Sequence, residues 1–212
     1  IPVTSTVLGL GAFPGDHPLF FGMLGMHGAV FANFAIDQAD LVICVGARFD
    51  DRVTGKASEF INNAFIIHVD VDKSELNKNK HAHIGVWGTV KDFFNRITPK
   101  APKADCGDWI KHLEQLRDRY PMAWNPGDGS QIKPQHFLRE LDKATRGKRT
   151  IYTTGVGQHQ MWAAQYLTFR EPRTFITSAG AGTMGFGLPA AVGAALGRPD
   201  STVINIDGDG SF

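Results

Sequence analysis

Short apolar runs that end in glycine or aspartate recur along this chain and constrain its fold more than any other feature. Residues 41–45 form one run that stops at Gly46, and residues 65–71 form another with Asp70 near its end. Residues 29–38, which precede them, repeat apolar side chains at the spacing of an α-helix. Alternating apolar strands and helices are typical of a parallel sheet with helices on its faces. The sequence therefore predicts an α/β fold with buried strands in a Rossmann-like parallel sheet.

A second set of strands and helices fills the last third of the chain. An amphipathic helix is expected at residues 134–145, and strands are expected at residues 150–153, 175–176 and 203–206. A polar stretch rich in proline and glycine separates the two halves, as in a linker between domains. We predict three parts, which are a domain at residues 1–98, a linker with one helix at residues 99–130, and a second domain at residues 131–212.

The last expected strand runs into a turn that holds Asp207 and Asp209 between glycines. Mg²⁺ takes oxygen ligands and usually binds between one or two carboxylates and the phosphates of a ligand. Ligands of open α/β sheets also bind outside the carboxyl ends of strands, which is where this turn is expected. The residues alone leave two interpretations open, a magnesium–phosphate site or a solvated turn after a core strand.

Three glycines at residues 180–185 form the pattern G-x-G-x-x-G after an expected strand, and Asp207 follows about 20 residues later. This is the fingerprint of a dehydrogenase that binds NAD, and the spacing alone favours that interpretation. Two features count against it. The preceding strand is polar for a central first strand, and Asp207 is followed by Gly-Asp-Gly, which a ribose contact does not need.

Composition excludes several classes of partner. The formal net charge is +1 and no basic run is present, so we expect neither nucleic acid nor a membrane surface as a partner. No apolar run is long enough to span a bilayer. Cys44 and Cys106 form neither a disulfide framework nor a metal motif, which indicates a reduced, cytoplasmic location. An organelle is the alternative if a targeting segment precedes Ile1.

Several stretches of the chain share the residues and the order of one enzyme family. They are residues 25–28, 46–55, 155–164, 177–191 and the closing Gly-Asp-Gly-Ser-Phe at 208–212. Together they resemble the catalytic subunit of the acetohydroxyacid synthases, also called acetolactate synthases, which use thiamine diphosphate. The resemblance implies a middle domain associated with FAD, followed by the first part of an α/β domain that binds thiamine diphosphate. It also implies a fragment, because the chain starts without Met and stops inside a motif.

The resemblance implies two groups of cofactor contacts. Those with FAD fall on Leu24, Gly25, Met26, His27, Gly46, Ala47, Arg48, Phe49, Asp50, Asp70 and Val71. Those with thiamine diphosphate fall on Gln158, His159, Gly182, Thr183, Met184, Asp209, Gly210 and Ser211. Asp209 is also the expected Mg²⁺ ligand, and Met184 is expected to hold the cofactor in a bent shape. The residues themselves agree in part, because a helix that opens at Gln158 offers free backbone N–H groups to a diphosphate.

A dense group of charges, Asp50-Asp51-Arg52, is expected in a loop after a strand. On residue type alone it is either a solvated surface ion pair or a clamp for a carboxylate. The family has its substrate-carboxylate arginine at this position. We therefore predict that Arg52 binds the carboxylate of a 2-ketoacid and that Asp51 holds the guanidinium in place.

The resemblance also implies a reaction. Pyruvate is decarboxylated on thiamine diphosphate, and the two-carbon unit joins pyruvate or 2-ketobutyrate in the biosynthesis of valine, leucine and isoleucine. FAD is structural there, the active sites form between subunits of a homodimer or larger homo-oligomer, and a small regulatory subunit is an expected partner. We expect the chain alone to be inactive, because the family's catalytic glutamate lies in another domain. The alternatives are another thiamine diphosphate decarboxylase, oxidase or carboligase, and a non-catalytic nucleotide-binding homologue.

Overall fold

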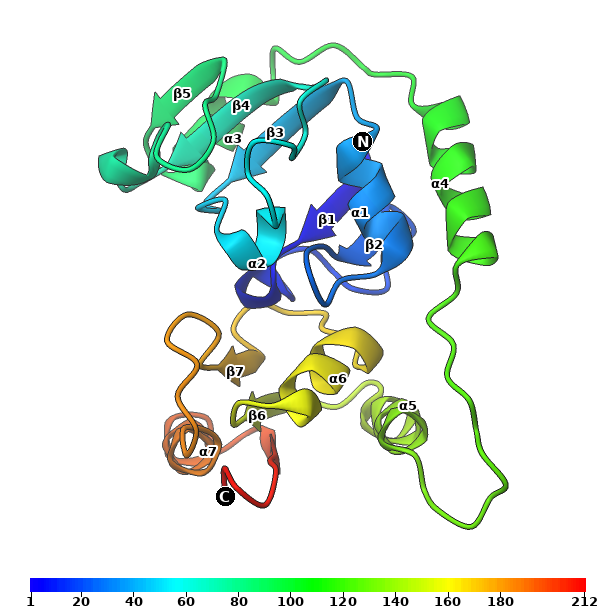
Figure 1. Ribbon diagram of the computed structural model, residues 1–212. Coiled ribbons are helices and arrows are strands. Elements are labelled where there is room, and N and C mark those ends of the chain that lie inside the picture. The colour runs from blue at the N-terminus through cyan, green and yellow to red at the C-terminus, as the bar shows by residue number, and fades with distance from the viewer. The chain divides into compact units, whose positions relative to one another are not determined.

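The computed structural model describes residues 1–212, which form two compact units (Figure 1). The first unit consists of residues 1–6 and 24–120, and the second consists of residues 7–23 and 121–212. The domain boundaries that the sequence predicts at residues 98 and 131 stay predictions. None of the helices is both long and apolar enough to cross a lipid bilayer.

A parallel sheet of three strands organises the first unit. Its strands, in the order β3-β4-β5, are β3 (Leu41–Val45), β4 (Phe65–Asp70) and β5 (Ile84–Trp87). Val45 of β3 is paired with Val69 of β4, so the carboxyl ends of both strands lie at one edge of the sheet. The strands expected at residues 41–45 and 65–71 are thus confirmed, whereas β5 was not expected.

Only one face of β3 is buried in this unit. Val42 and Cys44 lie in the core, whereas Leu41, Ile43 and Val45, which point to the other face, are exposed. Successive side chains of a strand point to opposite faces, so this alternation marks a strand that is covered on one side only. The prediction that residues 41–45 form a buried strand is therefore wrong for that face.

Helices and one further strand complete the first unit. They are β1 (Val3–Ser5), α1 (Val30–Asp37), α2 (Asp51–Thr54), α3 (Val90–Ile97) and α4 (Gly107–Arg119), with a 3₁₀ turn at Lys73–Glu75. The helix expected at residues 29–38 is confirmed as α1. It packs against α4, and the side chains of Gln38 and His112 make a hydrogen bond of 2.9 Å between these two segments. The apolar core includes Val42, Cys44, Phe49, Ile61, Ala64, Ile66 and Ala82.

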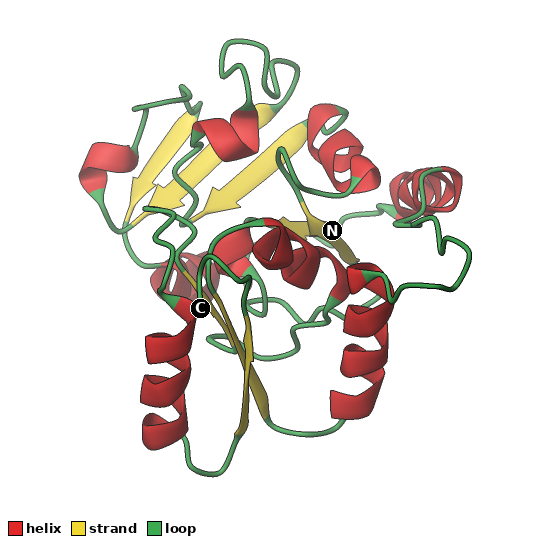
Figure 2. Cartoon of the chain, turned by 60° about the horizontal axis from the view of Figure 1, so that its bottom comes forward, coloured by secondary structure: helices red, strands yellow, loops and turns green.

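The second unit is a parallel sheet with helices on both faces. Its strands, in the order β7-β6-β8, are β6 (Thr150–Thr154), β7 (Phe175–Thr177) and β8 (Thr202–Ile206). Its helices are α5 (Pro134–Thr145), α6 (Gln158–Tyr166) and α7 (Gly187–Gly197), joined by β2 (Phe20–Met23) and a 3₁₀ turn at Val7–Gly9. The crossovers through α6 and α7 run in opposite directions, and right-handed crossovers then place these helices on opposite faces (Figure 2).

Aromatic side chains fill the core of the second unit beneath β6. The ring of Phe169 lies 4.6 Å from that of Phe175 and 5.9 Å from that of Tyr152. Burial raises the pKa of the Tyr152 hydroxyl, whose oxygen lies 2.6 Å from Thr145 Oγ1. The N-terminal segment of the unit is tied to the same region, because Gly15 N donates to Phe169 O at 2.7 Å. These contacts hold the sheet that positions the site described next.

Candidate cofactor and substrate sites

The sheet of the second unit has a topological switch point between β6 and β8. The chain leaves the central strand β6 toward β7 on one side and returns to form β8 on the other side. Ligands of open α/β sheets bind in the crevice outside the carboxyl ends of strands at such a point. The residues that follow these two strand ends are 155–159 and 207–211, which belong to the stretches that the sequence singles out.

Close packing brings these two segments together. A Cβ atom on Gly155 would lie 1.9 Å from Ser211 Oγ and 2.0 Å from Asp207 Oδ1, so only glycine fits there. The loop after β7 reaches the same place, because Gly185 N donates to Ser211 Oγ at 3.1 Å. Ser211, which is 3% exposed, is thus the point where three predicted segments meet.

Asp207 is fixed by the side chains of neighbouring strands. Its Oδ2 atom accepts a hydrogen bond of 3.2 Å from Asn205 Nδ2, and Asn205 Oδ1 accepts one of 2.9 Å from Thr153 Oγ1. The ring of His159 lies against the other oxygen, with 3.4 Å between Nε2 and Oδ1. His159 Nε2 is buried, and apart from this long contact with Asp207 it makes no hydrogen bond.

The N-terminus of α6, next to these residues, has no side-chain cap. Gly157, with φ 153°, precedes the helix, and no side chain accepts from its first turn. The first N–H groups of a helix have no partner within the helix, and they bind anions such as phosphate. Gln158 and His159 stand at this end. The residues therefore fit a diphosphate, because the uncapped helix end and the ring of His159 lie in one place.

Asp209 lies on the exposed turn that follows β8. One carboxylate oxygen accepts from Gly210 N at 2.9 Å, and the other makes no hydrogen bond. No group of three or more His, Cys, Asp or Glu side chains converges as a metal site anywhere in the structure. The turn thus offers a hard cation a single carboxylate, which suits a metal that takes its remaining ligands from phosphate oxygens and other groups.

The segment 182–184 lies beside this turn. Gly182 has a φ of 67°, and Thr183 N donates to Ser178 Oγ at 3.0 Å, which fixes the loop. Met184 is 57% exposed, and a Cβ atom on Gly210 would lie 3.3 Å from its Cε atom. Met184 therefore stands at the surface next to the acidic turn, where it is free to contact a ligand.

The sheet order does not fit a dehydrogenase that binds NAD. In the dinucleotide fingerprint the glycine loop follows a central strand, and the ribose acid ends the strand next to it. Here the glycines of 180–185 follow β7, which is the edge strand, and Asp207 follows β8 on the far side of β6. The spacing of the glycines and Asp207 fits the fingerprint, but Asp207 follows a strand that does not neighbour β7, so it is not where a ribose contact needs it.

In the first unit two predicted segments are in direct contact. Gly25 has a φ of 100°, and a Cβ atom on it would lie 2.6 Å from Arg52 O. Met26 N donates to Arg52 O at 2.8 Å, and Arg52 Nη1 lies 3.7 Å from Met26 Sδ. The 24–27 loop therefore packs on the peptide group of the predicted substrate arginine. His27 and Leu24 belong to the same loop, and Leu24 N donates to Ser5 O.

The charged group 50–52 forms a helical turn, so the prediction of a loop is wrong. Asp50 caps α2 by accepting from Arg52 N at 3.0 Å, and its other oxygen lies 3.2 Å from Arg48 Nε. Asp51 and Arg52 form no ion pair with each other, because adjacent residues of a helix do not face one another. Asp51 therefore does not hold the guanidinium in this structure.

The remaining predicted FAD contacts lie at the carboxyl ends of β3 and β4. Gly46 has a φ of 68°, and a Cβ atom there would meet only Val90 Cγ2 at 4.0 Å, which leaves space for a ligand on the Cα side of this residue. Asp70 Oδ1 accepts from Asp72 N at 2.8 Å. Val71 and Ala47 follow the two strand ends, and Val71 is exposed.

Phe49 is also a predicted FAD contact, but its side chain is 5% exposed and belongs to the core. Its ring lies 5.0 Å from that of His68 and 6.3 Å from that of Phe60. A ligand would therefore reach the backbone of Phe49 but not its ring.

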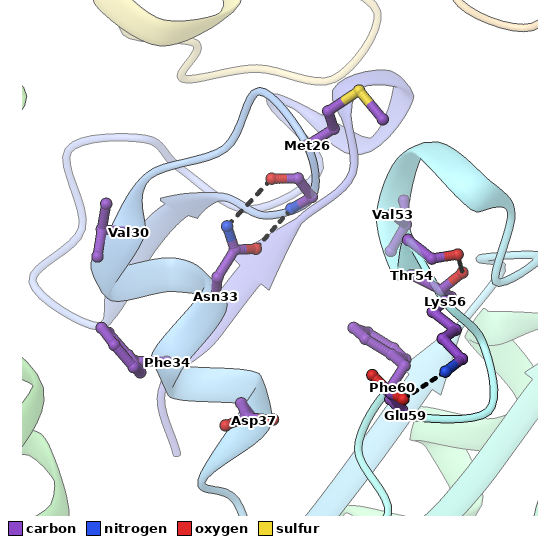
Figure 3. Close-up of a pocket in the computed structure, with 12 residues that line it drawn as sticks. Met26, Val30, Asn33, Phe34, Asp37, Val53, Thr54, Lys56, Glu59 and Phe60 are labelled. Atoms are coloured by element: carbon purple, nitrogen blue, oxygen red, sulfur yellow. Dashed lines mark hydrogen bonds and ion pairs between the residues drawn. The ribbon is translucent and has the colours of Figure 1, made fainter.

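A cavity of about 540 Å³ adjoins the 24–27 loop (Figure 3). Most of its wall is apolar and comes from α1 and from residues 53–60, and its lining includes Met26, Val30, Phe34, Val53 and Phe60. Asn33 also lines it, and the side chain points at the backbone of Gly25. Asn33 was not predicted as a site residue.

Gln160 was missed as well. Its Nε2 atom donates to Thr177 Oγ1 at 2.7 Å, and Thr177 Oγ1 lies 2.7 Å from Thr154 Oγ1, so α6 is tied to the ends of β6 and β7. The available signal was a polar residue placed among the apolar residues of a helix.

Comparison with known proteins agrees with this geometry. Residues 1–97 match the model of the thiamine pyrophosphate enzyme central domain, and residues 155–212 match that of the C-terminal TPP binding domain. The whole chain is 49% identical to acetolactate synthase 1, chloroplastic, of Zea mays, and 48% identical to the protein of that name from Oryza sativa subsp. japonica. It is 47% identical to acetolactate synthase, chloroplastic, of Arabidopsis thaliana. The chain spans about a third of the length of these curated relatives, with 34%, 34% and 32% covered.

Two domain matches in the expected order, together with identity along the whole chain, account for both units. The chain therefore belongs to the thiamine pyrophosphate enzymes, and it carries residues of their central domain and of their C-terminal cofactor-binding domain.

Proposed function

We propose that the protein carrying this chain is an acetolactate synthase. It decarboxylates pyruvate with thiamine diphosphate and condenses the two-carbon unit with pyruvate or 2-ketobutyrate, in the biosynthesis of branched-chain amino acids. The observation that carries the proposal is the meeting of residues 155–159, 185 and 207–211 at the carboxyl ends of β6 and β8. These residues lie in a chain that is 47–49% identical along its whole length to acetolactate synthases.

Thiamine diphosphate, when bound, supplies the electron sink that a 2-ketoacid needs for decarboxylation. The residues of this chain bind and orient it. The first N–H groups of α6, at Gln158 and His159, would donate to the diphosphate, and Gly210 and Ser211 belong to the turn beside it. Met184, exposed beside the turn, would contact the bound cofactor and help to hold its shape.

Mg²⁺ is proposed to bind Asp209. The free carboxylate oxygen and the exposed position of this turn support the assignment. The carboxylate and the diphosphate together give the mixed oxygen ligands that Mg²⁺ prefers.

FAD is proposed to lie over the carboxyl ends of β3 and β4. The open space on the Cα side of Gly46 allows close approach, and the half-exposed guanidinium of Arg48 suits a pyrophosphate. A structural role is proposed for FAD, because the net reaction transfers no electrons.

Arg52 is proposed to bind the carboxylate of the second 2-ketoacid. Its side chain is exposed, and apart from Met26 Sδ it has no side-chain partner, so the guanidinium fork remains available. A planar guanidinium binds a carboxylate through two parallel hydrogen bonds.

Homodimers or larger homo-oligomers are proposed for the whole protein, with a small regulatory subunit as a further partner. Large apolar side chains such as Val71, Trp87 and Leu196 are exposed, which is typical of surfaces that other chains or domains cover. Light scattering on the purified protein would test the first proposal, and co-purification from cells would test the second.

The comparisons bear on the cellular location of the whole protein, for which the sequence indicates the cytoplasm, with an organelle as the alternative. The three relatives are named chloroplastic, which favours the organelle over the cytoplasm that the sequence first indicated. We propose an organelle location for the whole protein, and cell fractionation followed by detection of the protein would test it.

The activity is tested by supplying pyruvate, thiamine diphosphate, Mg²⁺ and FAD to the protein expressed at the full length of its relatives. The account predicts acetolactate as the product. Acetaldehyde or acetyl phosphate in its place would identify a decarboxylase or an oxidase of the same cofactor class. No turnover of pyruvate would contradict the synthase and these two alternatives.

A further inference from the structure

The side-chain amide of Asn33 holds both polar groups of one peptide residue. Asn33 Oδ1 accepts from Gly25 N at 2.7 Å, and Asn33 Nδ2 donates to Gly25 O at 3.0 Å (Figure 3). Asn33 is partly buried on α1, eight residues after Gly25. Its amide therefore connects the helix to the 24–27 loop through two hydrogen bonds.

Only an amide side chain can make this pair of bonds. Asparagine carries a donor and an acceptor on one planar group, whereas aspartate at neutral pH carries acceptors only. With aspartate at residue 33, one carboxylate oxygen would face the carbonyl oxygen of Gly25. The chemistry of this position therefore demands asparagine and not merely a polar residue of its size.

Contacts of Gly25 and Met26 extend this restraint to the backbone of Arg52. The Cα atom of Gly25 is packed so closely on Arg52 O that a Cβ atom would lie 2.6 Å from it. The next residue, Met26, donates its N–H to the same carbonyl at 2.8 Å. Arg52 is held from the other side by Asp50, whose Oδ1 atom accepts from Arg52 N at 3.0 Å. The backbone of Arg52 is thus fixed between Asp50 and the loop that Asn33 restrains.

We propose that Asn33 is a positioning residue for 2-ketoacid binding, which acts by fixing the 24–27 loop against the backbone of Arg52. The proposal rests on the proposed function, because it takes Arg52 as the carboxylate-binding group. Asn33 itself touches neither substrate nor cofactor in this role. Its effect is on the position of the Arg52 guanidinium.

The test compares Asn33→Ala and Asn33→Asp with Asn95→Ala and Asn95→Asp in the full-length protein. Asn95 is exposed on α3 and its side chain makes no hydrogen bond, so it controls for the same chemical changes. Amide hydrogen exchange reports on the loop, and steady-state kinetics with pyruvate report on substrate binding. Thermal unfolding checks that each variant is folded.

We expect Asn33→Ala to speed exchange at Gly25 and Met26 by about tenfold or more, because an exposed N–H exchanges faster than a bonded one. We expect KM for pyruvate to rise about tenfold while kcat changes less than about twofold, as for loss of ground-state positioning. Asn33→Asp keeps the acceptor for Gly25 N–H, so it should protect Gly25 in part and still raise KM. The Asn95 variants should change neither quantity.

A double-mutant cycle separates positioning from general loss of structure. If Asn33 acts through Arg52, Asn33→Ala should change KM less than about twofold in a protein that already carries Arg52→Ala. An equal effect of Asn33→Ala in both backgrounds would overturn the proposal, as would an unchanged KM in the single variant. If the Asn33→Ala variant does not fold, the same double-mutant cycle is measured with the isosteric Asn33→Asp. A wild-type protein that makes no acetolactate while Gly25 stays protected would instead refute the proposed function, and with it the ketoacid role of Asn33.

Discussion

His159 and Asp207, which are 48 positions apart in the sequence, lie side by side at the carboxyl ends of neighbouring strands, with 3.4 Å between Nε2 and Oδ1. His159 stands in the first turn of α6, and Asp207 begins the turn after β8. The pair therefore brings the uncapped N-terminus of a helix next to the turn that holds Asp209. A cofactor with a diphosphate and a bound metal needs both features in one place.

The glycine at residue 155 is predicted to be indispensable for this arrangement. Its missing Cβ makes room for Ser211 Oγ and Asp207 Oδ1, which would lie 1.9 and 2.0 Å from an added Cβ. We expect Gly155→Ala to lower the free energy of unfolding by about 1–3 kcal/mol, as overpacking does. We also expect it to weaken cofactor binding. Thermal unfolding and titration with thiamine diphosphate measure the two effects.

Gly193→Ala is the matched control for this change. Nothing lies within 4 Å of a Cβ atom on Gly193, which is in the middle of α7. Alanine in a helix is about 1 kcal/mol more favourable than glycine, so this variant should be slightly more stable. Equal destabilisation by both substitutions would show that residue 155 has no special packing role.

Asp209→Asn is predicted to weaken Mg²⁺-dependent cofactor binding. A neutral amide is a poorer ligand for a hard cation than a carboxylate, so the Mg²⁺ concentration at half saturation should rise about tenfold or more. The measurement is a titration of the full-length protein with Mg²⁺ at a fixed concentration of thiamine diphosphate, followed by fluorescence.

Asp200→Asn serves as the control for charge. Asp200 pairs with Arg198 and Arg149 at the surface, and these contacts lower the pKa of its carboxyl group. Exposed ion pairs contribute little to stability, and the Mg²⁺ titration should not shift. An unchanged titration for Asp209→Asn as well would argue against Asp209 as a ligand.

Arg52→Lys is predicted to raise KM for pyruvate about tenfold or more, because lysine cannot make two parallel hydrogen bonds to a carboxylate. The loss corresponds to about 1.4 kcal/mol or more. Arg96→Lys, an exposed position on α3, is the control and should leave KM unchanged. If both lysine variants keep the wild-type KM, the carboxylate of the substrate binds elsewhere.

Cys44 is predicted to be inert toward alkylation in the folded protein. Burial raises the pKa of its thiol from 9.0 to about 12, and the Sγ atom donates to Ala47 O at 3.3 Å. Iodoacetamide at pH 8 should therefore modify Cys106, which is partly exposed, and should reach Cys44 only after unfolding. Mass spectrometry counts the modified cysteines, and rapid labelling of Cys44 in the native protein would contradict its burial.

The same pKa shift gives a pH dependence of stability. Because the folded state holds the thiol in its neutral form, the stabilising contribution is complete below about pH 9 and is lost as the pH rises from 9 toward 12. Cys44→Ser should remove this loss of stability, since serine does not ionise in this pH range. Chemical denaturation at pH 8 and pH 10 should thus show a smaller drop for Cys44→Ser than for the wild type.

Strands with continuous apolar runs were predictable from the sequence. The run at 41–45 matches β3 residue for residue. β5 escaped notice because Gly85 interrupts a run of four residues, and a glycine weakens the strand pattern. α3 also escaped, although Thr89 caps it by accepting from Asp92 N at 3.0 Å, and this spacing was the available signal.

The candidate site was predictable only where it follows strand ends. The turns after β6 and β8 could be foreseen as neighbours, because parallel strands end at the same edge. The contacts of Asn33 could not be predicted, because its partners are backbone groups of a loop whose path no local sequence pattern gives. The expected pairing of Asp51 with Arg52 failed because the residues form a helical turn, in which neighbours diverge.

The most direct measurement is the structure of the full-length protein with thiamine diphosphate and Mg²⁺ bound. The account predicts the diphosphate at the N-terminus of α6 and the metal ion against Asp209, beside Ser211. A metal ion bound away from the turn at residues 207–211, or a nicotinamide dinucleotide in the same crevice, would contradict it.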